Sequence, residues 1–133
     1  MQVVIFKLGN EQFALDTEKV QSINDAMEIT IVPKAPEHIK GLVNLRGNVI
    51  SLLDINILLD VPKSLETQDN IIIVDTGDEL IGISVDQVEE VIEIQDELIE
   101  NPIEDFKEEY IEGIINFKDR IVTLININKI LIK

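Results

Sequence analysis

The stretch Ile39–Leu59 reads IKGLVNLRGNVISLLDINILL, and the later stretch Ile111–Leu131 reads IEGIINFKDRIVTLININKIL. At an offset of 72 residues, 7 of the 21 aligned positions are identical, among them Gly41 with Gly113. Most other positions exchange one aliphatic residue for another, whereas the shared glycine and asparagines do not follow from an aliphatic-rich composition. The two stretches therefore indicate an internal duplication.

The segment upstream of each stretch is repeated as well. Residues 3–23 (VVIFKLGNEQFALDTEKVQSI) align with residues 71–91 (IIIVDTGDELIGISVDQVEEV) at an offset of 68, which pairs Val20 with Val88. The change of offset requires only a short insertion in the second copy. Most of the chain is therefore covered by the repeat.

The polar segment 61–70, which contains Pro62, has no periodicity and is the best candidate for a linker. At 133 residues the chain has the length of one domain. We predict a single domain over 1–133, with a first copy at roughly 1–66 and a second at roughly 67–133. The alignment leaves open whether the two copies exchange strands.

The composition favours strands over helices. The chain has 25 Ile, 12 Val and 13 Leu but only 3 Ala, and β-branched residues pack well on sheets while alanine favours helices. Short apolar runs, including 28–32, alternate with turn signals such as Arg46-Gly47-Asn48, and Asp16–Glu18 can form a brief helical turn. Each copy holds about five short strands, which predicts an all-β barrel or sandwich with an aliphatic groove between the copies.

Charge and composition exclude several classes of function. The chain carries 26 acids against 11 bases, a net charge of -15, which argues against nucleic-acid and anionic-lipid binding. It has no cysteine and one histidine, His38, so sites with several His or Cys ligands are excluded, and we predict neither metal nor cofactor. Residues 1–6 lack the pattern of a signal peptide, and no apolar run is long enough to span a bilayer.

The charges are unevenly distributed. Twelve acids and one base, Lys107, lie between Asp86 and Glu112. The first copy instead holds a small group of basic residues, namely Lys34, His38, Lys40 and Arg46. This asymmetry can orient a partner, and the acids can equally serve only to keep an aliphatic-rich protein in solution.

One motif raises the question of catalysis. Ile73–Gly77 (IVDTG) resembles the active-site turn of aspartic proteases, and an aspartic hydrolase acting through Asp75 is a remote alternative function. The equivalent turn in the first copy, Lys7–Glu11, offers no second aspartate, and a hairpin turn with Gly77 at positive φ explains the motif. The serines lie outside nucleophile-elbow contexts, so we predict no catalytic residues and no enzymatic activity.

Arg46 stands at the predicted tip of a hairpin in an acidic protein. The chain has only one other arginine, Arg120. A guanidinium group suits bidentate contact with a carboxylate, so Arg46 is predicted to bind a carboxylate on a partner or on its own chain.

The segment Ile39–Asp54, which follows a proline-containing loop, resembles the signature of the CheW family of chemotaxis coupling proteins. Phe6–Phe13, Val85–Val91 and Glu109–Gly113 are also similar to segments of that family, in the same order along the chain. The chain departs from the family pattern at Ser51, Asn56 and Asn126, where the family often has proline, a basic residue and aspartate.

The resemblance implies two five-stranded SH3-like barrels. It also implies a non-catalytic, cytoplasmic adaptor that couples the tips of methyl-accepting chemoreceptors to the regulatory domain of the histidine kinase CheA, recruited to membrane-associated receptor arrays. The kinase-binding positions would be Val20 and Gly41, and the receptor-binding positions Arg46, Val88 and Val91. The alternatives are a coupling module of another receptor–kinase pathway and a CheV-like protein.

Overall fold

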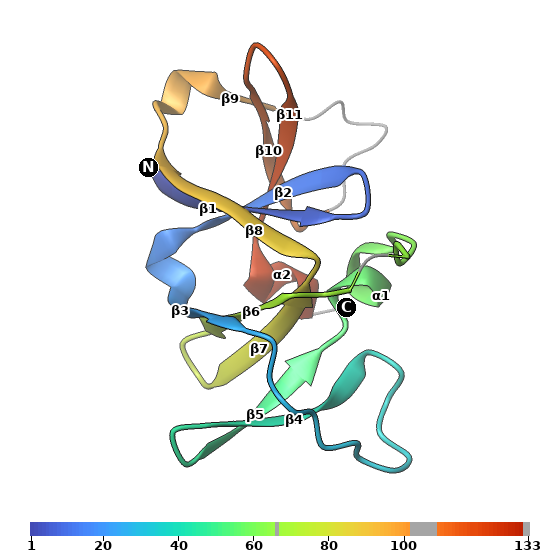
Figure 1. The fold of residues 1–133 in the computed structure, drawn as a ribbon. Helices are drawn as coiled ribbons and strands as arrows, with labels where there is room; N and C mark the ends of the chain where they lie inside the picture. The colour runs from blue at the N-terminus through green and yellow to red at the C-terminus, as the bar shows by residue number, and fades with distance from the viewer. Residues whose placement is uncertain (66, 102–108, 132–133) are drawn as a thin grey trace.

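A computed structural model describes residues 1–65, 67–101 and 109–131, which form two β-sheets with a few short helices (Figure 1). The upper sheet in Figure 1 has the strand order β8-β1-β2-β11-β10-β9. Its strands are β1 (Gln2–Leu8), β2 (Glu11–Asp16), β8 (Gln87–Glu93), β9 (Ile99–Glu100), β10 (Ile111–Asn116) and β11 (Ile121–Ile125).

The lower sheet has the order β3-β6-β7-β5-β4. Its strands are β3 (Val20–Asp25), β4 (Ile39–Leu45), β5 (Asn48–Leu53), β6 (Asn70–Asp75) and β7 (Leu80–Val85). The helices in the described ranges are short: η1 (Thr17–Lys19), α1 (Ile55–Leu59), η2 (Asp96–Leu98) and α2 (Ile127–Leu131).

The two sheets are built from both halves of the chain. The first hairpin, β1–β2, lies in the sheet that holds β8 to β11, and the hairpin β6–β7 lies in the sheet that holds β3 to β5. When each strand is replaced by its repeat equivalent, the order β3-β6-β7-β5-β4 becomes β8-β1-β2-β11-β10. The two sheets therefore have one architecture with exchanged hairpins.

The pairing register is also repeated. The parallel pair β5–β7 places Ser51 opposite Ile81, and the parallel pair β11–β2 places Thr123 opposite Phe13. These partners are related by the offsets of 72 and 68 residues found in the sequence. The internal repeat is thus preserved in the pairing as well as in the strand order.

A shared core fills the space between the two sheets. Its largest cluster combines residues of both sheets, such as Phe6 and Leu15 from one and Ile72 and Ile83 from the other. The groove predicted between the copies is therefore largely closed by packing. Apolar burial of this kind stabilises a fold by about 25 cal/mol per Å².

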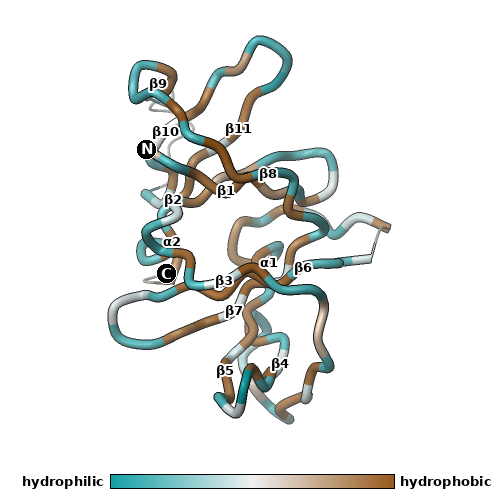
Figure 2. The backbone as a smooth tube through the Cα atoms, turned by 60° about the vertical axis from the view of Figure 1, so that its left-hand side comes forward, coloured by the Kyte–Doolittle hydropathy of each residue, from teal (hydrophilic) through white to brown (hydrophobic). Residues whose placement is uncertain are grey.

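Each sheet has a second cluster of its own on the opposite face. Val3 and Ile5 belong to that of the upper sheet, and their repeat equivalents Ile71 and Ile73 belong to that of the lower sheet. Because β1 and β6 are buried on both faces, their sequences VVIF and IIIV are continuous rather than alternating. Figure 2 shows these strands as hydrophobic segments and the hairpin loops as hydrophilic ones.

The predicted all-β class is confirmed, and one local prediction is corrected. The run 28–32 forms no strand, only an isolated bridge from Thr30 to Leu42. Helices α1 and α2 were not predicted, and they begin after Asp54 and Asn126, whose side chains accept hydrogen bonds from backbone N–H groups in the first turn. Asn126 caps α2 although the family that the sequence resembles often has aspartate there. An asparagine side-chain oxygen accepts the capping hydrogen bond from a backbone N–H as a carboxylate does.

The copy boundary near residue 66 stays a prediction, since Glu66 lies outside the described residues. Lys107, the single base of the acidic stretch, lies outside them too. No helix within the described ranges is long and apolar enough to cross a membrane.

Candidate functional site

Val20 lies at the start of β3, an edge strand of the lower sheet. The pairing of β3 with β6 shifts by one residue after Val20, so that Val20 faces Val74 and Ile23 faces Ile72. Both partners belong to the core between the sheets. Because cross-strand partners share a face, this β-bulge puts Val20 and Ile23 on one side of the strand. Val20 is half-buried there, and Ile23 is 38% exposed.

Val88 and Val91 lie on β8, an edge strand of the upper sheet. The pairing of β8 with β1 shifts in the same way, so that Val88 faces Phe6 and Val91 faces Val4. These partners are likewise in the shared core. Val88 is half-buried and Val91 is 45% exposed, so β8 also presents an aliphatic pair at its edge.

The predicted kinase-binding and receptor-binding valines are therefore equivalent positions of the two copies. Val20 aligns with Val88, Ile23 aligns with Val91, and each pair spans a bulge at the same place. Ile23 is not among the site residues predicted from the sequence. Its signal was its alignment with Val91, a position already assigned to the receptor-binding set.

Gly41 is buried in β4, and as a glycine it has no side chain that could contact a partner. A Cβ atom there would lie 2.5 Å from Ile29 Cγ2 and 2.6 Å from the carbonyl oxygen of Thr30. The equivalent Gly113 has a similar neighbour, with Ile99 Cγ2 at 2.6 Å. The glycine at position 41 is thus required by the close approach of segment 29–30, and it can affect binding only through the backbone that it positions.

Arg46 and Gly47 form the two-residue turn between β4 and β5, with φ of 54° and 86°. Positive φ at both positions is the geometry of a type I′ hairpin turn. Asn44 Oδ1 accepts a hydrogen bond of 2.9 Å from the backbone N–H of Gly47 and holds the turn. The guanidinium of Arg46 is exposed, and no ion pair joins it to any residue that the structure describes.

Arg46 lines a cavity of about 200 Å³ together with residues of β3, β5 and β7, among them Ser22, Ile50 and Leu80. No residue of β8 lines this cavity. Arg46 thus lies beside the strand that carries Val20, and this cavity does not bring it together with Val88 and Val91. The three predicted receptor-binding residues are therefore divided between two parts of the molecule.

A network of polar side chains joins the two halves. The buried carboxylate of Asp86 accepts hydrogen bonds from Gly9 N–H, Ser64 Oγ and Gln68 Nε2. Gln68 Oε1 in turn accepts a 2.8 Å bond from Lys40 Nζ. A cavity of about 250 Å³ borders this network, and the polar groups of the network bond to one another. We therefore interpret it as a structural joint between the hairpin ends and the linker.

Burial lowers the pKa of Lys40, and the nearby charge of Lys63 acts in the same direction. Lys63 itself pairs with Asp54, Nζ to Oδ2 at 2.6 Å. Lys40 therefore carries its charge in the folded protein at a cost, because desolvation disfavours the ammonium form.

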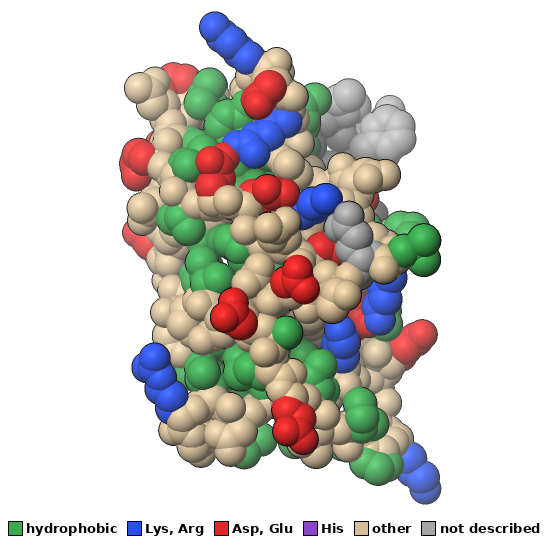
Figure 3. Space-filling model, in the orientation of Figure 1, with side chains coloured by type: hydrophobic (Ala, Val, Ile, Leu, Met, Phe, Trp, Pro, Cys, Tyr) green, Lys and Arg blue, Asp and Glu red, His purple; other side chains and the backbone are tan. Residues whose placement is uncertain are grey.

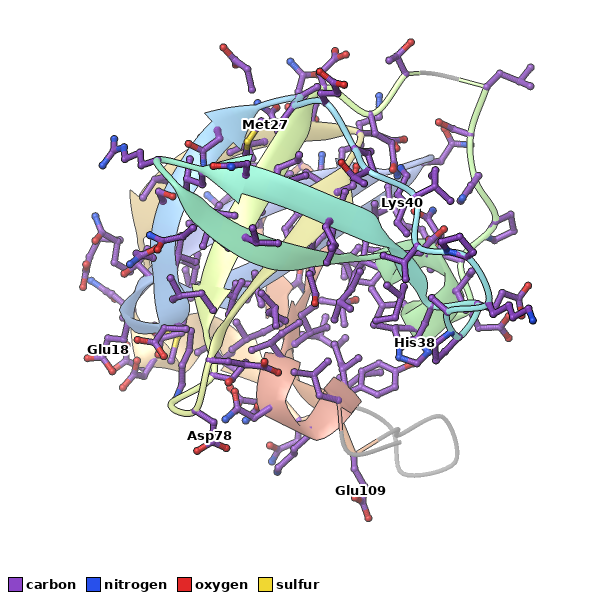
Figure 4. The ribbon with its side chains drawn as sticks, turned by 90° about the horizontal axis from the view of Figure 1, so that it is seen from below. Glu18, Met27, His38, Lys40, Asp78 and Glu109 are labelled. Carbon is purple, nitrogen blue, oxygen red and sulfur yellow. The ribbon has the colours of Figure 1, made fainter. Side chains whose placement is uncertain are left out.

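The Asp-Thr-Gly motif is a hairpin turn between β6 and β7. Asp75 Oδ1 accepts a hydrogen bond of 2.8 Å from Gly77 N–H, and Thr76 N–H donates to Glu79 O. Figure 4 shows the neighbouring Asp78 at this tip, pointing away from the molecule. The turn geometry alone accounts for the motif, and within the described ranges no group of three or more His, Cys, Asp or Glu side chains could hold a metal ion.

Acidic and hydrophobic side chains are intermixed on the molecular surface. On the face shown in Figure 3, red acidic side chains are scattered over the middle and upper parts, with green hydrophobic side chains between them. A surface of this kind can bury aliphatic anchors in an interface while the surrounding charges select the partner.

Residues 2–133 match the family model described as CheW-like domain. The chemotaxis protein CheW of Klebsiella aerogenes is 31% identical over 135 aligned residues, which cover 98% of this chain and 81% of that protein. The chemotaxis protein CheW of Bacillus subtilis is 28% identical, with 99% and 87% covered. The crystal structure of the scaffolding protein TtCheW from Thermoanaerobacter tengcongensis is similar with a TM-score of 0.87 and 31% identity, covering 97% of this chain and 86% of that one.

Proposed function

Since this chain belongs to the CheW-like domain family, we propose that it is a non-catalytic adaptor that couples the cytoplasmic tips of chemoreceptors to the histidine kinase CheA. The observation that carries this proposal is the pair of equivalent sheet edges. Val20 with Ile23 on β3, and Val88 with Val91 on β8, each present a partly exposed aliphatic pair above the shared core. Two separate docking edges on one shared core are what a protein needs to hold two partners at once.

The edge β3 is the proposed kinase-binding surface. Val20 would pack against an apolar side chain of the kinase's regulatory domain, and Ile23 extends the same surface. Gly41 contributes indirectly, because it keeps segment 29–30 in place on β4. A few buried aliphatic anchors give an interface most of its binding energy.

The edge β8 and the turn at Arg46 are the proposed receptor-binding surfaces. Val88 and Val91 supply apolar contact area. The exposed guanidinium of Arg46, which forms no ion pair with the residues that the structure describes, supplies a charged donor for a carboxylate of the partner. The protein would act in the cytoplasm and be recruited to membrane-associated receptor arrays through these contacts.

Reconstitution with CheA and receptor-containing membranes tests this function. Kinase autophosphorylation should rise when the chain is added to CheA and receptor together, and it should stay at the basal rate of CheA when either the chain or the receptor is left out. An equal rate with and without the chain would refute the proposal.

The absence of catalysis is tested separately. The chain should not cleave peptides at acid pH, and Asp75→Asn should leave coupling unchanged because Asp75 lies in a turn at the tip of a hairpin. Pepstatin-sensitive cleavage that Asp75→Asn abolishes would instead establish an aspartic hydrolase.

A further inference from the structure

Asn70, the first residue of β6, forms hydrogen bonds through its side chain to both proposed docking edges, β3 and β8. Its Oδ1 accepts a hydrogen bond of 3.0 Å from the backbone N–H of Val88 on β8. Its Nδ2 donates a hydrogen bond of 3.4 Å to the backbone carbonyl of Asn24 on β3. The two edges belong to different sheets, so one amide connects strands that do not pair with each other.

The bond to Val88 lies at a break in the strand ladder. Val88 stands directly before the bulge at which the pairing of β8 with β1 changes register. Bulges leave a strand locally less well paired, so a side-chain acceptor at this point fixes where the N-terminal end of β8 lies. The same valine is the half-buried member of the proposed receptor-binding pair.

The backbone of Asn70 is held on both sides. It pairs with Asp25 on β3 and with Val85 on β7, two residues before β8 begins. The amide therefore cannot follow a movement of β8 without moving β3 or losing a hydrogen bond. A displacement of either edge strand is therefore transmitted to the other through the side chain of Asn70 and its two hydrogen bonds.

The repeat provides a comparison within the same molecule. Gln2 is the equivalent residue at the start of β1, and its Oε1 accepts a hydrogen bond of 3.3 Å from Thr17 Oγ1 in an exposed position. In the described residues, no hydrogen bond of Gln2's side chain reaches an edge strand. The connection made by Asn70 is thus particular to one of the two copies.

We propose that Asn70 is a positioning residue that couples the two edges, so that a partner bound at β8 changes the affinity for a partner bound at β3. This proposal rests on the proposed function, which assigns the receptor to β8 and the turn at Arg46 and the kinase to β3. Because coupling between sites is reciprocal, kinase bound at β3 must change the affinity for receptor by the same factor.

The test measures the dissociation constant of the full chain for the CheA regulatory domain, with and without a saturating receptor-tip fragment. The coupling ratio is the dissociation constant without the receptor fragment divided by that with it. Titrating the receptor fragment with and without saturating kinase domain gives the same ratio independently. In the unsubstituted protein we expect the receptor fragment to change kinase affinity by about fivefold or more. In Asn70→Ala the ratio should fall to near one, while the affinity for each partner alone changes by less than the coupling factor.

Asn70→Asp keeps the acceptor for Val88 N–H and replaces the donor to Asn24 with an acceptor. It should lose the coupling as well, and it provides a second variant if Asn70→Ala does not fold. Gln2→Ala is the matched control, and it should keep the full ratio.

Three results would overturn the proposal: a ratio of one in the unsubstituted protein, a ratio that persists in both Asn70 variants, or a loss of affinity for each partner alone with the ratio unchanged. Failure of the unsubstituted protein to bind either partner would overturn the proposed function, and this proposal with it.

Discussion

Val20 and Val88 occupy the same position in the two copies of the repeat. Each is half-buried on an edge strand, directly before a β-bulge, and each packs against the core between the sheets. One structural position has thus been placed twice in the molecule, where it can serve two different partners. The pair therefore provides matched substitutions that test whether each edge has its own partner.

Val20→Glu is expected to weaken binding of the CheA regulatory domain by at least about tenfold, because it puts a charge into an apolar contact. Titration calorimetry gives the affinity, and circular dichroism checks that the fold is kept. Ile23→Glu should act in the same direction with less risk to the core, since Ile23 is 38% exposed. Unchanged affinity in both folded variants would refute the assignment of β3.

Val91→Glu is the reciprocal substitution on β8. We expect it to reduce binding to receptor-containing membranes by about tenfold or more and to leave binary affinity for the kinase domain within about twofold, because Val91 lies on β8, in a different sheet from β3. Co-sedimentation with the membranes measures the first effect. A variant that loses the kinase instead would reverse the assignment of the two edges.

Arg46→Glu is expected to impair receptor-dependent kinase activation, since it replaces the guanidinium donor with a like charge for a partner's carboxylate. Arg46→Gly removes the charged side chain but keeps the turn, so it distinguishes the effect of the charge from an effect on the turn geometry. Glycine favours the positive φ found at this position, so this variant should melt at the same or a higher temperature and still activate poorly. Full activation by either variant shows that the side chain of Arg46 is not needed.

Gly41→Ala is expected to lower the free energy of unfolding by about 1–3 kcal/mol, because the new methyl group would overlap Ile29 and the Thr30 carbonyl. Gly113→Ala should destabilise the chain to a similar extent through Ile99. Only Gly41→Ala should also weaken kinase binding, as measured at a temperature where both variants are folded. Equal loss of binding in both variants would mean that Gly41 acts through global stability alone.

The lowered pKa of Lys40 predicts a stability change at alkaline pH. Between the lowered pKa in the folded state and the ordinary value of 10.5, the unfolded chain binds more protons than the folded chain at this residue. The free energy of unfolding therefore rises with pH in that window. Urea titrations give the free energy of unfolding of the wild type and of Lys40→Met. The wild type should gain stability relative to the variant as the pH approaches 10.5. A constant or shrinking difference would show that the pKa of Lys40 is not lowered in the folded protein.

The sequence predicted the strands and the repeat because central strands such as VVIF and IIIV leave a clear aliphatic signal. It did not predict α1 and α2, since five-residue helices rich in isoleucine and leucine look like further strand. Their one signal was a cap residue, Asp54 or Asn126, after a strand. Run 28–32 looked like a strand, but only Thr30 finds a partner, because Gly41 lets this segment cross close to β4.

Of the candidate site, the family resemblance supplied the valine positions and the internal alignment paired Val20 with Val88. Neither predicted the bulges that bring Val88 and Val91 to one side of a strand. The sequence could not predict the position of Arg46 relative to β3 either, because that depends on the parallel contact of β5 with β7. Long-range pairing of this kind leaves no local pattern.

The exchanged hairpins also set the order in which the protein can be completed during synthesis. The strands β1 and β2 are made first, yet their neighbours outside the hairpin are β8 and β11, at residues 87–93 and 121–125. The lower sheet has all its strands once residue 85 has left the ribosome, whereas the first hairpin must wait for nearly the whole chain. Until then the outer face of the hairpin, with Val3, Ile5 and Ala14, lacks its later partners Ile115, Val122 and Leu124. This exposed apolar face makes the first hairpin a segment of the nascent chain that benefits from a chaperone.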